Sequence, residues 1–110
     1  MDQELINKIK QFMIDRDWKQ FHNGKDLAIS LSLEASELLE IFQWSGTDLY
    51  KEDKLDKIKD ELADVLVYAF LLADTYNLDI EQIIAQKLIK NAEKYPVDKA
   101  KGNAKKYTEL

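Results

Sequence analysis

The sequence predicts an all-α fold, a four-helix bundle within a single domain that spans residues 1–110. Three observations predict it. Only one proline and three glycines interrupt 110 residues, and the proline and two of the glycines fall at expected helix ends, which favours long helices over strands. Apolar residues recur at the spacing that one face of a helix requires. A hydrophobic content of 45% is that of a folded domain.

Four helices follow from this periodicity, over about residues 3–15, 25–43, 54–76 and 80–94. Asp79 is the expected N-cap of the fourth, because Gln82 follows three residues later in a capping-box pattern. Pro96 ends that helix, since proline lacks the N–H that a helix uses. The tail, residues 97–110, shows no clear period and is expected to be irregular.

The second and third helices are apolar on more than one side. In the second helix, Ile29, Leu33 and Leu38 point in different directions. A helix that is buried on several sides in so short a chain indicates an oligomer. We therefore expect self-association to complete the bundle.

Composition and charge exclude several classes of protein. A net charge of −5 argues against nucleic acid as the main partner. The longest nearly apolar run, residues 62–73, contains Asp64 and is too short to span a membrane. The absence of cysteine excludes disulfides and thiolate metal sites. The N-terminus resembles no targeting peptide, so a cytoplasmic protein is expected. Seven lysines in residues 87–106 form either a solvated surface or a contact for an anionic ligand.

Four carboxylates are placed unusually. Glu34 falls in the middle of the apolar stripe of the second helix, and Glu37 falls at its edge. Glu61 and Asp64 share one side of the third helix, next to its apolar stripe. A carboxylate on an apolar face is costly unless it is paired or bound to a metal. Each pair is spaced i, i+3, so its oxygens point to one side of the helix.

Helix register brings the two pairs together. When the second and third helices fold back on each other, the midpoint between the pairs is Leu49, inside the polar connection of residues 45–53. Four converging carboxylates repel one another unless a cation joins them. Oxygen ligands suit Mg²⁺ first and Mn²⁺ next, and such sites commonly act on phosphates. The alternative is two exposed acidic pairs that bind no metal.

The same residues resemble a known family. Leu33-Glu34-Ala35-Ser36-Glu37 and Glu61-Leu62-Ala63-Asp64 are similar to the E-x-x-E and E-x-x-D pattern of MazG-like nucleotide pyrophosphohydrolases, which belong to the all-alpha NTP pyrophosphatase superfamily. Further strings resemble its dCTP pyrophosphatase-like branch: Arg16-Asp17-Trp18, Gln20-Phe21-His22, Phe42-Gln43-Trp44, Asn91 with Lys94-Tyr95-Pro96, and Lys106-Tyr107-Thr108-Glu109-Leu110. One position differs, because Leu33 stands where many relatives carry a further acid, so the number of bound metals is open.

The resemblance implies a MazG-like bundle and an activity. The activity is Mg²⁺-dependent hydrolysis of a (deoxy)nucleoside triphosphate, dCTP or a modified dCTP, to the monophosphate and pyrophosphate. Metal-site and catalytic carboxylates are then Glu34, Glu37, Glu61 and Asp64, with Glu37 favoured as the group that activates water. The implied substrate-binding residues are Trp18, Trp44, Tyr68, Lys87, Asn91, Lys94 and Tyr95. The family is typically a dimer or a dimer of dimers, and Lys87 and Asn91 are expected to reach substrate across a subunit interface.

Two alternatives stay open at this point. The chain could be a non-catalytic helical module of the same fold that binds a nucleotide or a partner without hydrolysis. Trp18 and Trp44 could be core or interface aromatics instead of stacking surfaces for a base. The preference for one base depends on a few hydrogen bonds that the sequence does not locate.

Overall fold

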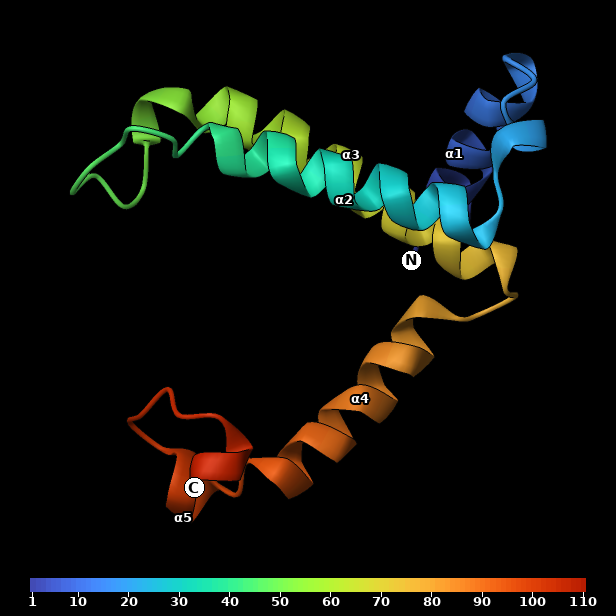
Figure 1. Ribbon diagram of the computed structural model, residues 1–110. Coiled ribbons are helices and arrows are strands. Elements are labelled where there is room, and N and C mark those ends of the chain that lie inside the picture. Colours follow the sequence, from blue (N-terminus) through green and yellow to red (C-terminus); the bar gives the residue numbers. More distant parts are fainter. The chain divides into compact units, whose positions relative to one another are not determined.

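The computed structural model describes all 110 residues and contains helices and turns but no strand (Figure 1). The predicted all-α class is confirmed. The chain forms two compact units, residues Met1–Asn77 and Leu78–Leu110. The organisation of both units as a single domain stays a prediction. No helix combines the length and the apolar character needed to cross a lipid bilayer.

The first unit holds α1 (Gln3–Asp15), η1 (Lys19–Phe21), α2 (Gly24–Glu40), η2 (Glu52–Lys54) and α3 (Leu55–Thr75). The three predicted helices are present within one residue of their expected ends, except that α2 ends three residues before Gln43. Beyond Glu40 the backbone N–H groups bond three residues back, as Ile41 does to the Leu38 carbonyl at 3.3 Å. This tightened last turn keeps the apolar period but leaves the α-helix.

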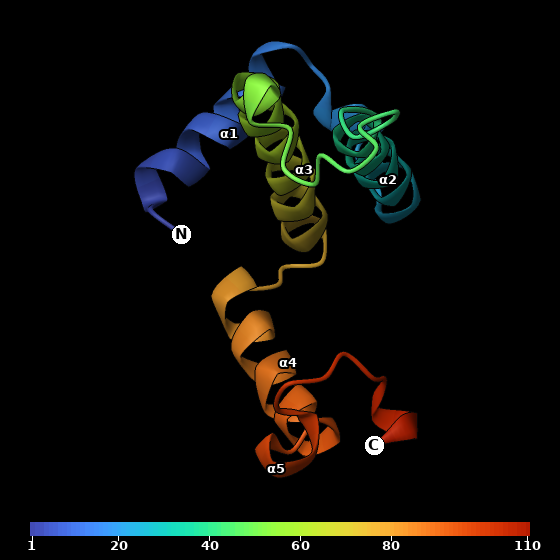
Figure 2. The ribbon, with the colours of Figure 1, turned by 90° about the vertical axis from the view of Figure 1, so that its left-hand side faces the viewer.

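Helices α2 and α3 lie side by side and antiparallel, as both views show (Figures 1 and 2). Asn23 begins α2 as its N-cap, because its side chain accepts a hydrogen bond from the Asp26 backbone N–H at 2.9 Å. The buried apolar residues of the hairpin are Leu27, Ile41, Phe70, Leu71 and Ala73. Their burial holds the two helices in one register.

Helix α1 and the segment after it are tied to the hairpin. Met13 is the buried residue of α1, and the Lys10 ammonium lies 3.4 Å from the Asp74 carboxylate of α3. The indole of Trp18 packs edge-to-face on Phe12, with ring centroids 5.9 Å apart. These contacts place the aromatic connection between α1 and α2 beside the hairpin.

The second unit contains α4 (Ile80–Lys94), α5 (Val97–Ala100) and η3 (Tyr107–Glu109). The Asp79 carboxylate accepts a hydrogen bond from the Gln82 backbone N–H at 3.0 Å, so the predicted N-cap is confirmed. The tail is less irregular than expected, since it forms one short helix and one 3₁₀ turn. Elements of a single turn are too short to show a period in the sequence. The rings of Tyr95 and Tyr107 pack edge-to-face at 6.0 Å and fold the tail back onto the end of α4.

Gly24 marks a close approach between the start of α2 and the end of α3. A Cβ atom at this position would overlap the hydroxyl and the ring of Tyr76, the C-cap residue of α3. The overlapping atoms belong to the outer end of the exposed Tyr76 side chain, so a larger residue at position 24 would require that side chain to move. The choice of residue at position 24 therefore depends on space beside Tyr76 and not on backbone conformation, because Gly24 has ordinary helical backbone angles.

We expect the variant Gly24→Ala to lose no more than about 1 kcal/mol of unfolding free energy, the lower end of the usual cost of overpacking, because the displaced atoms are the outer end of an exposed tyrosine side chain. In the background of Tyr76→Ala the same substitution should cost far less, because the overlapping ring is gone and alanine is the better helix former. Urea denaturation of the four proteins measures both values. An equal loss in the two backgrounds would contradict the contact.

Candidate metal centre

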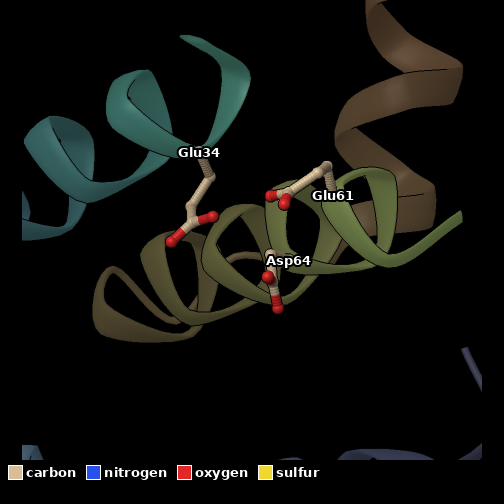
Figure 3. A group of neighbouring side chains, drawn as sticks. All are labelled: Glu34, Glu61 and Asp64. Atoms are coloured by element: carbon tan, nitrogen blue, oxygen red, sulfur yellow. The ribbon is translucent and has the colours of Figure 1, made fainter. Parts of the chain in front are cut away.

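The hairpin brings Glu34 of α2 face to face with Glu61 and Asp64 of α3 (Figure 3). One oxygen from each of these three carboxylates lies within 4.8 Å of the other two. Glu34 and Glu61 are half-buried, while Asp64 is exposed. The two helices thus meet in the register that folding about Leu49 predicts.

Two of these carboxylates carry an unsatisfied oxygen. Oε2 of Glu34 and Oε2 of Glu61 are buried and have no hydrogen-bond partner. Burial, then a hydrogen bond and negative charge from Glu37, then the charges of Asp64 and Glu61, raise the pKa of Glu34 from 4.5 to about 7. The pKa of Glu61 is also raised, first by a hydrogen bond with Glu37 and then by burial. Both groups therefore resist ionisation as long as no cation compensates their charge.

Glu37 occupies a different place in the cluster. It is exposed and lies outside the group of three converging oxygens, but its carboxyl group shares hydrogen bonds with Glu34 and with Glu61. A hydrogen bond between two carboxyl groups needs a proton on one of them. The four predicted carboxylates are thus brought together, as three whose oxygens converge and a fourth beside them.

The donor set fits a hard divalent cation. All four groups offer carboxylate oxygen, the ligand atom of Mg²⁺ and Mn²⁺ in proteins. The stronger evidence for a metal site is that Glu34 and Glu61 each have a buried oxygen without a hydrogen-bond partner. Exposed acidic groups are common without a metal, but burying an oxygen that has no partner costs free energy. A cation that takes these oxygens removes that cost.

A cleft of about 410 Å³ adjoins the carboxylates and is walled by α1, α2 and α3. Its lining residues are Lys8, Ile9, Phe12, Met13, Trp18, Glu34, Asp64, Val67 and Tyr68. Burial, and then the charges of Glu34 and Asp64, raise the pKa of Tyr68, so its hydroxyl stays protonated and can donate a hydrogen bond. The structure therefore places two predicted binding residues, Trp18 and Tyr68, next to the carboxylates.

A second cavity, of about 360 Å³, shares Trp18 and Tyr68 with the first. Its remaining lining residues are Phe21, His22, Asp26, Leu27 and Ser30. Asp26 and Ser30 were not predicted from the sequence as site residues. Their spacing was the available signal, because residues 26, 30 and 34 follow one another at intervals of four along the same face of α2.

Other predicted binding residues lie elsewhere. Trp44 is 92% exposed, has a left-handed φ of +66° and lies outside both of these cavities. Lys87 and Asn91 stand one turn apart on α4, in the second unit. Lys94 and Tyr95, at the end of α4, contact the Tyr107 ring; the Lys94 ammonium lies 4.8 Å from its centroid. A contact of these residues with substrate stays a prediction.

Comparison with known proteins gives three consistent results. The chain matches the model of the MazG-like family over residues 29–110. It is 36% identical over 105 residues to dCTP pyrophosphatase 1 of Mus musculus and 34% identical over 105 residues to that of Homo sapiens, and each match covers 91% of this chain and 62% of the relative. A crystal structure of a pyrophosphatase from Archaeoglobus fulgidus matches with a TM-score of 0.79 and 37% identity, over 84% of this chain and 90% of that one. The chain therefore spans less than two thirds of the length of its mammalian relatives.

The raised pKa of Glu34 predicts how the stability of the metal-free protein depends on pH. The unfolded chain has a pKa near 4.5 at this residue and the folded chain about 7. The folded state therefore holds the proton more tightly, and this contribution is fully present below about pH 4.5 and lost as the pH rises through about 7. In chelator, wild type should lose thermal stability relative to the variant Glu34→Gln between pH 5 and pH 8.

The variant Glu40→Gln is the matched control, since it changes a glutamate of the same helix outside the cluster. Its melting temperature should stay parallel to that of wild type over this pH range. Saturating Mg²⁺ at pH 8 should stabilise wild type far more than Glu34→Gln. A difference between wild type and Glu34→Gln that does not change with pH would contradict the raised pKa.

Proposed function

The chain belongs to the MazG-like family, and from that premise we propose that it is a Mg²⁺-dependent pyrophosphohydrolase that converts dCTP, or a modified dCTP, to the monophosphate and pyrophosphate. The observation that carries this proposal is the convergence of three carboxylates, with two buried bare oxygens, beside an aromatic cleft. The names of its relatives, dCTP pyrophosphatase 1 and an archaeal pyrophosphatase, support the reaction and the substrate.

Glu34, Glu61 and Asp64 are the residues that would hold the cation, because their oxygens already converge. Mg²⁺ bound there would neutralise phosphate charge and help to activate a water molecule as the nucleophile. The chain itself contributes rigidity, since two of the three ligands lie one turn apart on α3 and the third faces them from the paired helix. This arrangement fixes the ligands before substrate enters.

Glu37 is the proposed general base. Its carboxyl group is exposed and touches the cluster without joining the converging oxygens, so it can accept a proton from the attacking water. The water oxygen forms a bond to the α-phosphorus, and the bond from that phosphorus to the bridging oxygen breaks. Pyrophosphate leaves with that oxygen, and the nucleoside keeps one phosphate.

The aromatic cleft is the proposed nucleotide pocket. The Trp18 indole offers a face on which a base can stack, and the protonated Tyr68 hydroxyl can donate a hydrogen bond to a substrate oxygen. We further propose that Trp44 and four residues of the second unit complete this pocket when copies of the chain associate. Those four residues are Lys87, Asn91, Lys94 and Tyr95.

Self-association, as a dimer or a dimer of dimers, is supported by exposed apolar side chains. Leu33 and Leu39 of α2 are 60% and 70% exposed, and Leu88 and Ile89 of α4 are 63% and 65% exposed. Several large apolar groups left open on one chain mark an interaction surface. The cytoplasmic location expected from the sequence stays a prediction.

A panel of canonical and modified triphosphates with Mg²⁺ tests the proposal, with the products identified by chromatography. We expect dCTP or a close analogue to yield monophosphate and pyrophosphate, and no free phosphate. Release of single phosphates would show that the bond between the α-phosphorus and the bridging oxygen is not the one that breaks. Saturable nucleotide binding without any turnover would instead favour the non-catalytic module.

The variant Glu37→Gln isolates the proposed base. We expect kcat to fall by about 10²–10⁴-fold, the usual contribution of a general base. Thermal stabilisation by Mg²⁺ should persist, because the three converging ligands remain. The variant Glu40→Gln should retain wild-type kcat. Unchanged kcat in Glu37→Gln would assign the proton transfer to another group.

A further inference from the structure

We propose that Asp26 selects the base, by accepting a hydrogen bond from the 4-amino group of a cytosine-type base and rejecting the 4-keto pyrimidines uracil and thymine. This inference rests on the proposed function and deepens it. It concerns the cavity of about 360 Å³ beside the aromatic cleft, whose residues Asp26 and Ser30 have no role in the proposed function so far.

The aromatic cleft and the adjoining cavity together offer a bound nucleotide one direction in which to lie. Asp26, Ser30 and Glu34 occupy one face of α2 at intervals of four, so they span about 12 Å along the helix at a rise of about 1.5 Å per residue. Glu34 lines the cavity with the carboxylates, and Asp26 and Ser30 line the adjoining one. Trp18 and Tyr68 belong to both cavities. With the phosphates at Glu34, the base reaches toward Ser30 and Asp26.

Asp26 is held in place for this contact. Its Oδ2 accepts a hydrogen bond from the Asn23 side-chain amide at 2.7 Å, and its backbone N–H donates to Asn23 Oδ1 at 2.9 Å. This reciprocal pair orients the carboxylate at the start of α2. Asp26 is exposed, and its Oδ1, which takes no part in the bond to Asn23, can accept a hydrogen bond from a ligand in the cavity that Asp26 lines.

The chemistry of the base edge then decides selectivity. Cytosine presents an N–H donor at its 4-position, whereas uracil and thymine present a carbonyl oxygen. A carboxylate accepts from the first and repels the second, because two acceptors face each other without a hydrogen. The Ser30 hydroxyl can donate to N3 of cytosine or accept from N3–H of uracil. Asp26 therefore distinguishes cytosine from uracil and thymine, whereas Ser30 can bond to either kind of base.

The ratio of kcat/KM for dCTP to that for dUTP tests the assignment, since the two substrates differ only at this edge. Wild type should favour dCTP by about tenfold to a hundredfold, as expected for one hydrogen bond to a charged group. In Asp26→Asn the ratio should fall to within a few-fold, because the amide can donate to the uracil carbonyl. Ser30→Ala should lower both values while keeping the ratio.

Asp56→Asn is the matched control. Asp56 lies in the first turn of α3, as Asp26 does in the first turn of α2, so both variants remove one acid from a helix N-terminus. Asp56→Asn should keep the wild-type ratio. A second measurement needs no variant: dCTP with two methyl groups on its 4-amino nitrogen lacks the donor, and wild type should treat it no better than dUTP.

The inference is overturned if wild type turns over dCTP and dUTP equally, if Asp26→Asn keeps the wild-type ratio, or if the dimethylated substrate matches dCTP. In these outcomes pyrophosphate is still released, so the proposed function stands. Absence of pyrophosphate from every triphosphate would instead overturn the proposed function itself.

Discussion

Repulsion among Glu34, Glu37, Glu61 and Asp64 is the constraint on which the rest of the structure depends. The α2–α3 hairpin holds these groups together although two of them carry buried bare oxygens. Burial and the neighbouring Glu37 carboxyl group raise the pKa of Glu34, and a hydrogen bond with Glu37 and then burial raise the pKa of Glu61. The apolar contacts along the hairpin offset the remaining cost. A divalent cation held by these oxygens would relieve the same repulsion, so binding one would stabilise the folded state.

Three kinds of side chain follow one another along α2 and beside it. Carboxylates stand in the middle of α2, the aromatic walls of Trp18 and Tyr68 come next, and Asp26 lies at the start of the helix. A nucleotide needs this sequence of environments, since its phosphates require a cation, its base requires a stacking face and its edge requires directed hydrogen bonds. Gly24 leaves room for the Tyr76 side chain at the end of α3, near the start of α2 where Asp26 lies.

Periodicity and register were enough to predict the helices and the meeting of Glu34 with Glu61 and Asp64, because a hairpin with a polar connection has one simple way to fold back. The predicted end of α2 was wrong by three residues, because a tightened turn after Glu40 continues the apolar period of the helix. Asp26 could not be predicted as a site residue, because an acid in the first turn of a helix is already explained by the helix dipole. Trp44 lies outside both cavities, and its contact with a base would need a second chain that the sequence cannot place.

The most direct measurement is the heat of Mg²⁺ binding to the chelator-treated protein at pH 8, without nucleotide. Calorimetric titration should show saturable binding to wild type and loss of that binding in a variant that carries Glu34→Gln, Glu61→Gln and Asp64→Asn together. That variant should remain helical, since its core is unchanged and its charge repulsion is removed. Equal Mg²⁺ affinity in the two proteins would contradict the central proposal, that Glu34, Glu61 and Asp64 hold a metal ion between the two helices.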